Sequence, residues 1–159
     1  MAPETILAAR RVSKAFRVDG RITHALEDIT LEARAGEFVS IIGPSGSGKS
    51  TLLNILCGLL RADAGEVLLH GRSVGADALL GRIGYMPQKD LLLPWRSVLE
   101  NVLLGPELQG RDLAAARRAA REALAHFDLA GFADDYPATL SGGMRQRVAL
   151  LRTFLCEQE

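Results

Sequence analysis

The sequence predicts a mixed α/β fold, with an antiparallel β part at the N-terminus and a helical part towards the C-terminus. Three observations support this prediction. β-Branched and other apolar residues mix with polar ones in the first third, as in half-exposed strands. A glycine-rich loop then separates an apolar run from a leucine-rich run. From Lys89 onward, apolar residues recur at the three- and four-residue steps of helices.

The first third predicts strands of two kinds. Residues 6–18 and 29–33 carry mixed polarity around the polar turn Asp19-Gly20-Arg21, which favours an antiparallel ribbon. Residues 37–42 are different, because four of the six are large apolar residues; this is typical of a buried parallel strand. Two further short strands are expected at residues 65–70 and 82–86.

Helices are expected after the glycine-rich loop and in the second half of the chain. The leucine-rich run after the loop is too long for a strand and predicts a buried helix. The helix in the second half with the clearest amphipathic pattern places its arginines outside the apolar stripe. The four predicted helices span residues 49–60, 97–104, 112–127 and 144–155.

Composition excludes several classes of protein. The chain has 48% hydrophobic and 24% charged residues, and 19 basic residues balance 19 acidic ones, so no overall positive field attracts nucleic acid or anionic lipid. The two cysteines, Cys57 and Cys156, lie far apart without metal-ligand spacing, which argues against a disulfide framework or a zinc site. The longest apolar stretch, residues 52–60, is too short to cross a bilayer. A soluble protein of a reducing cytosol is expected.

The glycine-rich loop fits the pattern G-x-x-x-x-G-K-[ST], which binds nucleotide phosphates when a buried strand precedes it and a helix follows. Glycines let backbone N–H groups turn towards phosphate, and the helix N-terminus adds its positive end. Lys49 would reach the β- and γ-phosphates and the Ser50 hydroxyl would bind Mg²⁺. The alternative is a plain glycine-rich turn. The predicted phosphate-binding residues are Gly43, Pro44, Ser45, Gly46, Ser47, Gly48, Lys49, Ser50 and Thr51.

A second helix N-terminus with anion-binding character follows about ninety residues later, in the segment LSGGMRQR of residues 140–147. Ser141 is a good N-cap residue, and Gly142 and Gly143 permit close approach to the backbone. The alternative is a capped helix without a ligand.

Together, the two segments resemble the ATP-binding subunits of ABC transporters: residues 43–50 resemble their Walker A loop, and residues 140–147 resemble their signature motif. The resemblance implies a P-loop NTPase core with an N-terminal antiparallel β subdomain and an α-helical subdomain. It assigns residues 1–88 and 144–159 to the β and core part, and residues 89–143 to the helical subdomain. It implies ATP and Mg²⁺ as cofactors. It also implies a head-to-tail dimer in which ATP lies between the P-loop of one subunit and Ser141, Gly142 and Gly143 of the other.

The resemblance gives two further residues a role. Gln88 matches the glutamine that contacts Mg²⁺ and the attacking water in this family, which makes it a catalytic and metal-binding candidate; the alternative is an exposed polar residue after a strand. Phe16 lies where the family often has an aromatic residue that stacks on adenine. The alternative for Phe16 is an inward-facing strand residue, which needs no ligand.

The resemblance is closest to importers of nitrate, sulfonate, taurine or thiamine precursors, which implies a cytoplasmic subunit bound peripherally to the inner face of the membrane. The implied partners are a transmembrane permease, a second ATP-binding subunit and, indirectly, a solute-binding protein, with no nucleic acid. Residues 91–95, LLLPW, lie where the family docks its permease; burial within the helical part is the alternative.

Family members that hydrolyse ATP continue past the signature helix into an apolar strand ending in Asp-Glu, and later a histidine. The twelve residues after Arg147 contain neither, and His24, His70 and His126 all precede them. The sequence therefore predicts a domain that is incomplete at its C-terminus and turns ATP over slowly or not at all. It also predicts uncovered apolar side chains at residues 38–42. The alternative functions are a non-transport ABC-type ATPase acting on DNA or ribosomes and a non-catalytic ATP-binding fragment.

Overall fold

A computed structural model describes residues 4–156 of the chain. The chain divides between Ile83 and Gly84 into two compact units. The first unit contains the glycine-rich loop, and the second contains the LSGGMRQR segment.

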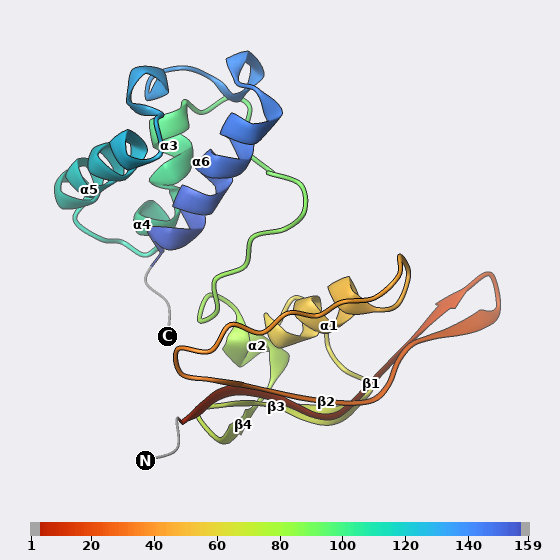
Figure 1. Ribbon diagram of the computed structural model, residues 1–159. Coiled ribbons are helices and arrows are strands. Elements are labelled where there is room, and N and C mark those ends of the chain that lie inside the picture. The colour runs from red at the N-terminus through yellow and green to blue at the C-terminus, as the bar shows by residue number, and fades with distance from the viewer. Residues whose placement is uncertain (1–3, 157–159) are drawn as a thin grey trace. The chain divides into compact units, whose positions relative to one another are not determined.

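The first unit is built on an antiparallel sheet with the strand order β2–β1–β3–β4 (Figure 1). Its strands are β1 (Thr5–Val18), β2 (Arg21–Arg34), β3 (Ala64–Leu69) and β4 (Arg72–Val74). The predicted ribbon is confirmed, since β1 and β2 pair in antiparallel fashion. Asp19 and Gly20 join them with φ values of 50° and 75°, the left-handed conformation that two-residue hairpin turns favour. β3 confirms the strand expected at residues 65–70, whereas β4 was not predicted.

Helix α1 (Lys49–Leu56) packs on one face of this sheet, and the short helix α2 (Ala76–Leu79) lies beside it (Figure 1). α1 ends earlier than predicted because Gly58 turns the chain with a φ of 77°. A side chain there would lie 2.4 Å from the carbonyl oxygen of Ala76, so only glycine fits. The buried core of the unit consists of Ala9, Val12, Leu26, Leu52, Ile55, Leu56, Val67, Leu69 and Leu79.

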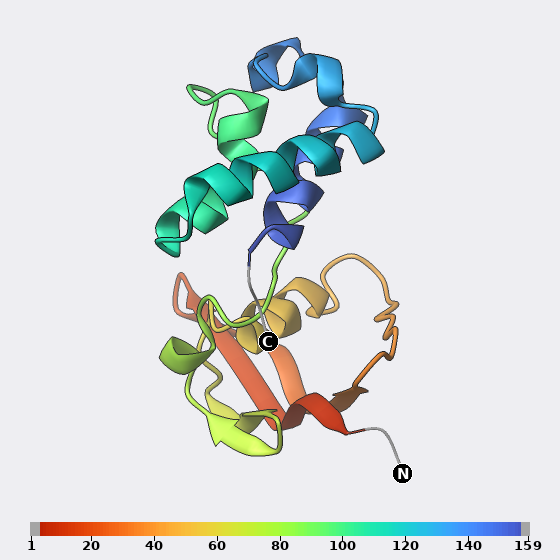
Figure 2. The same cartoon turned by 90° about the vertical axis from the view of Figure 1, so that its left-hand side faces the viewer.

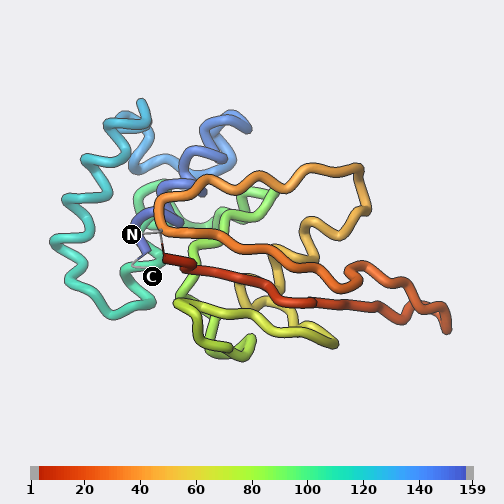
Figure 3. The backbone as a smooth tube through the Cα atoms, turned by 60° about the horizontal axis from the view of Figure 1, so that its bottom comes forward, coloured from red at the N-terminus to blue at the C-terminus, as the bar shows by residue number. Residues whose placement is uncertain are grey.

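Two predicted strands do not form. Residues 37–42 are irregular, and Phe38 and Ile42 are 93% and 91% exposed. Figure 3 shows this segment as open chain between the end of β2 and the start of α1. Residues 82–86 are also irregular. A parallel strand needs a hydrogen-bonding neighbour, and among residues 4–156 no strand pairs with either segment. The expectation of uncovered apolar side chains at residues 38–42 is thereby confirmed for Phe38 and Ile42.

The second unit is helical (Figure 2). Its helices are α3 (Val98–Val102), α4 (Leu104–Leu108), α5 (Leu113–His126) and α6 (Gly142–Phe154), with 3-10 turns η1 (Ala130–Phe132) and η2 (Pro137–Thr139) between the last two. The helix expected at residues 97–104 thus forms as two short helices. Ser97 caps the first of them, accepting a hydrogen bond from the backbone of Glu100, whose side chain bonds back to the N–H of Ser97.

The core of the second unit joins α3, α5 and α6. It contains, among others, Val98, Leu99, Val102, Ala120, Leu124, Val148, Ala149 and Leu151. The sequence placed residues 144–159 with the β and core part, whereas Val148, Ala149 and Leu151 of α6 pack in the helical unit because they form its apolar face. Residues 1–3 and 157–159 of the predicted division lie outside the described part. In that part, no helix is both long and apolar enough for a membrane crossing.

Candidate functional site

The glycine-rich loop leads directly into the N-terminus of α1, and no side chain caps this end of the helix. Gly48 is the N-cap residue, no side chain accepts a hydrogen bond there, and the first turn has no acidic residue. The first N–H groups of a helix need partners. The N-terminus of α1 therefore presents backbone donors and the positive end of the helix dipole to a ligand, an arrangement suited to phosphate oxygens.

Lys49 directs its ammonium group back into the loop. Its Nζ donates to the carbonyl oxygens of Gly43 (2.9 Å) and Pro44 (2.7 Å) and to the hydroxyl of Ser47 (3.2 Å). Ser50, the next residue, is exposed in the first turn of the helix. Backbone donors, an ammonium group and a hydroxyl thus come together at one helix end, and this donor set fits a polyphosphate with a bound divalent cation.

Gly48 is required by the fold as well as by the pattern. Its φ is 86°, and a side chain there would lie 2.3 Å from the carbonyl oxygen of Ala25 and 2.9 Å from the side chain of Leu26, both in β2. Gly46 has a similar φ of 80°, but a side chain there would meet no atom within 4 Å. β2 therefore holds the loop closely at Gly48 and leaves it open at Gly46.

This difference predicts unequal effects of two matched substitutions. Gly48→Ala adds backbone strain and a collision with β2, so it is expected to lower the free energy of unfolding by about 3 kcal/mol. Gly46→Ala adds only the strain, about 1 kcal/mol. Urea denaturation followed by far-ultraviolet circular dichroism measures both. Equal losses in the two variants would contradict the close packing of Gly48 on β2.

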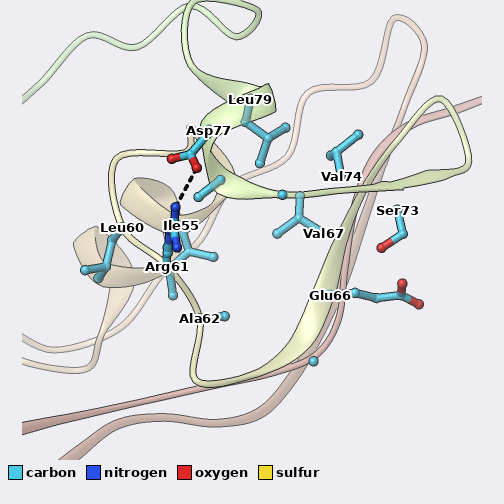
Figure 4. Close-up of a pocket in the computed structure, with 13 residues that line it drawn as sticks. Ile55, Leu60, Arg61, Ala62, Glu66, Val67, Ser73, Val74, Asp77 and Leu79 are labelled. Carbon is cyan, nitrogen blue, oxygen red and sulfur yellow. Dashed lines mark hydrogen bonds and ion pairs between the residues drawn. The ribbon is translucent and has the colours of Figure 1, made fainter.

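Two hollows in the first unit are lined by different sets of residues. One, of about 290 Å³, lies between the loop and β2 and includes Lys49 and Gly48 in its lining. The other, of about 450 Å³, lies between α1, β3 and α2, where Arg61 pairs with Asp77 across an apolar floor (Figure 4). The larger hollow contains none of the predicted site residues, so the chemistry favours the loop.

The N-terminus of α6 is the second predicted anion site. Ser141 caps it as expected, since its hydroxyl accepts a hydrogen bond from the N–H of Met144 at 3.3 Å. A side chain at Gly143 would meet no atom within 4 Å, and one at Gly142 only the Arg145 guanidinium at 3.9 Å. The fold itself does not demand glycine at either position. Their small size leaves this helix end open to a ligand.

α6 also fixes the segment that follows Gln88. The Gln88 side chain is exposed, while its carbonyl oxygen accepts a hydrogen bond from Gln146 Nε2 at 3.1 Å. Arg145 Nε pairs with the Asp90 carboxylate at 3.0 Å, and Arg152 donates to the Asp90 carbonyl at 2.7 Å. α6 therefore holds residues 88 and 90 through three of its side chains. Sequence patterns did not reveal these contacts, because they join residues more than fifty positions apart.

Phe16 lies on β1 in the first unit, opposite Thr23 of β2, and its ring is 38% exposed. The ammonium of Lys14 lies 5.8 Å from the ring centroid, within cation–π range.

The segment 91–95 of the second unit exposes Leu91 and Trp95 (59% and 70%), while Leu92 is buried in the helical core.

Comparison with known proteins identifies relatives over most of the chain. The model of the ABC transporter family matches residues 26–159. An uncharacterized ABC transporter ATP-binding protein of Bacillus subtilis, YtlC, is 46% identical over 131 residues, which are 82% of this chain and 50% of the relative. The formylaminopyrimidine import ATP-binding protein ThiZ of Halalkalibacterium halodurans is 40% identical over 96% of this chain and 57% of its own length. Taurine and nitrate import ATP-binding proteins are also similar. The chain spans about half the length of these curated relatives, except the nitrate protein, of which it covers 22%.

The fold has a solved counterpart. The ATP-binding cassette MJ0796, whose dimeric structure was solved in a post-hydrolysis state bound to ADP and Pi, aligns with a TM-score of 0.84 and 36% identity. The alignment covers 94% of this chain and 69% of that one. The predicted fold class is confirmed by this likeness.

Proposed function

Because the chain belongs to the ABC transporter family of ATP-binding proteins, we propose that it binds MgATP and couples it to solute uptake through a transmembrane permease. The observation that carries the proposal is the uncapped N-terminus of α1 behind the glycine-rich loop, with the Lys49 ammonium at its centre. No acidic side chain of the first turn competes for these donors.

In this proposal, different residues bind different parts of the nucleotide. Residues 43–51 hold the phosphates, with Lys49 exchanging its contacts to the loop carbonyls for phosphate oxygens. Ser50 would hold Mg²⁺ through its hydroxyl, and the ion would supply positive charge that neutralises the phosphates. For Gln88 the role in Mg²⁺ contact stays the one that the family resemblance implies. Phe16 stacks on adenine. Among the described residues no group of three His, Cys, Asp or Glu side chains forms a metal site, and Mg²⁺ held largely by phosphate, hydroxyl and water needs none.

The signature end of α6 completes the site from a second subunit in our proposal. Its open glycines and the Ser141 cap offer donors to the γ-phosphate of a nucleotide held by the partner's loop. The solved cassette MJ0796 is dimeric, which supports an assembly of two copies. Such a dimer explains why one chain carries two helix ends suited to phosphate.

We further propose that residues 91–95 dock the permease. Leu91 and Trp95 are exposed apolar side chains, and α6 fixes the segment beside them by hydrogen bonds to Asp90 and Leu91. Several relatives are named as importer subunits for taurine, nitrate and a thiamine precursor, which supports a cytoplasmic subunit on the inner face of the membrane. A solute-binding protein takes part only indirectly.

Hydrolysis of ATP requires chemical groups beyond those that bind it. Residues 1–159 contain no apolar run ending in Asp-Glu after the LSGGMRQR segment, and no histidine follows it. Stabilisation of the phosphoryl transition state depends on such groups. We propose that a polypeptide of these 159 residues binds MgATP but turns it over slowly or not at all. A radiolabelled-ATP assay showing turnover like that of an intact homologous cassette would contradict this.

Affinity purification from native membranes tests the importer role. A tagged protein should retain a transmembrane permease, and Trp95→Ala should reduce the amount retained, because it removes the largest exposed apolar side chain of residues 91–95. Phe132→Ala is a matched control on an exposed aromatic residue elsewhere in the second unit. Retention of nucleic acid at physiological salt would instead favour a non-transport ATPase. ATP binding without turnover beside an intact partner would favour a non-catalytic module.

A further inference from the structure

The strand that carries Phe16, β1, loses its pairing with β3 just before that residue. β3 pairs with β1 as far as the Ser13–Ala64 pair, and beyond it β1 continues only with β2. Figure 3 shows the two strands running on together past the rest of the sheet. The ladder between β1 and β2 is irregular between Val12 and Ala15. The backbone pairing of β1 with β2 therefore does not by itself determine the direction in which the Phe16 side chain points.

Asp63 supplies the missing contacts where β3 stops. Its backbone N–H donates to the Ser13 carbonyl at 2.9 Å. Its carboxylate accepts the N–H of Ala15 at 2.8 Å and the ammonium of Lys14 at 2.6 Å. One residue thus bonds three consecutive residues of β1, all immediately before Phe16.

The same carboxylate acts on the ring through a second route. Lys14 Nζ lies 5.8 Å from the centroid of the Phe16 ring, and Asp63 fixes that ammonium group. The hydrogen bonds from Ala15 and Lys14 lower the pKa of Asp63, so the carboxylate stays charged at neutral pH. Backbone direction and the cation beside the ring therefore both depend on Asp63.

We propose that Asp63 is a positioning residue for the adenine base, because its carboxylate fixes Ala15 and Lys14 and thereby orients the Phe16 ring. The proposal rests on the proposed function, in which that ring stacks on adenine. Asp63 lies immediately before β3 and takes no part in phosphate binding. Its contribution is therefore specific to ligands that carry a base.

The test compares ATP with inorganic tripolyphosphate, which has the phosphates but no base. Dissociation constants of both, in the presence of Mg²⁺, are measured by isothermal titration calorimetry for the full protein and its variants. Asp63→Ala should weaken ATP binding about five- to tenfold, on the scale of a partly lost base–aromatic stack. Its affinity for tripolyphosphate should stay within about twofold of the starting protein, which also verifies that the variant is folded.

Three further variants sharpen the comparison. Asp63→Asn keeps an acceptor for Ala15 but loses the charge that holds Lys14, so its loss should be smaller. Asp63→Ala should add no further loss to Phe16→Ala, since both act on one stack. Asp77→Ala removes another ion-pair carboxylate of the same unit, at the hollow in Figure 4, and should change neither affinity.

Equal weakening of both ligands by Asp63→Ala would overturn the proposal, as would unchanged ATP affinity or additive losses with Phe16→Ala. In each of these cases the starting protein still binds ATP, so the proposed function stands. If the starting protein binds neither ligand, the proposed function itself fails. The two failures are thus distinguishable.

Discussion

Lys49→Ala is expected to weaken MgATP binding by about a hundredfold or more, equivalent to roughly 3 kcal/mol. The substitution removes the ammonium group that would contact the phosphates. It also removes the three hydrogen bonds that Nζ makes to Gly43, Pro44 and Ser47, so the loop loses its internal tie. Charge and loop geometry are lost together, which is why the effect is larger than that of one ordinary hydrogen bond.

Lys89→Ala is the matched control for this variant. It removes the same charge from an exposed site in the second unit, outside the loop, and should leave the dissociation constant within about twofold. Fluorescence titration with a labelled ATP analogue measures both variants. A Lys49→Ala protein that binds within about threefold of the starting protein would show that the loop does not hold the phosphates through this residue.

Asn101→Leu is expected to lower the free energy of unfolding of the second unit by about 2–4 kcal/mol. Asn101 has no exposed surface, and its side chain bonds to backbone groups of three residues just before it in the chain. Its Oδ1 accepts the N–H of Leu93 at 2.7 Å, and its Nδ2 donates to the carbonyls of Leu93, Arg96 and Ser97. Leucine has nearly the same shape but leaves these groups without a partner.

Trp95 is the chain's one tryptophan and lies within the turn that Asn101 holds, so its fluorescence during urea unfolding reports on this unit. Arg118→Leu, on the exposed face of α5, places the same apolar side chain where no buried backbone depends on it. That control should change stability by less than about 0.5 kcal/mol. A loss under about 1 kcal/mol in Asn101→Leu would mean that the turn is held by other contacts.

The elements that sequence patterns predicted well are those that depend on local interactions. The β1–β2 hairpin turns at Asp19 and Gly20 because their own backbone conformations allow it. α5 and α6 begin at Asp112 and Ser141 because these side chains cap the helices. The glycine-rich loop likewise stands directly before a helix, since Gly46 and Gly48 take the required positive φ values.

The features that sequence patterns predicted wrongly or missed depend on contacts between residues distant in the sequence or on how a turn packs. Residues 37–42 have the composition of a buried strand, but a strand requires a partner, and none of the described strands pairs with them. The roles of Asp63 and Asn101 were also missed. Asp63 acts on a strand 48 residues earlier in the sequence, and the buried bonds of Asn101 depend on how the turn at residues 93–97 folds over α3. No short motif encodes such contacts.

In the proposed function, the glycine-rich loop and the N-terminus of α1 bind the phosphates of ATP. Calorimetric titration of the purified protein with MgATP tests it most directly, with tripolyphosphate as competitor. One saturable site per chain is expected, displaced by tripolyphosphate and weakened about a hundredfold or more by Lys49→Ala. Absence of saturable binding, or binding that tripolyphosphate does not displace and Lys49→Ala leaves intact, would contradict it.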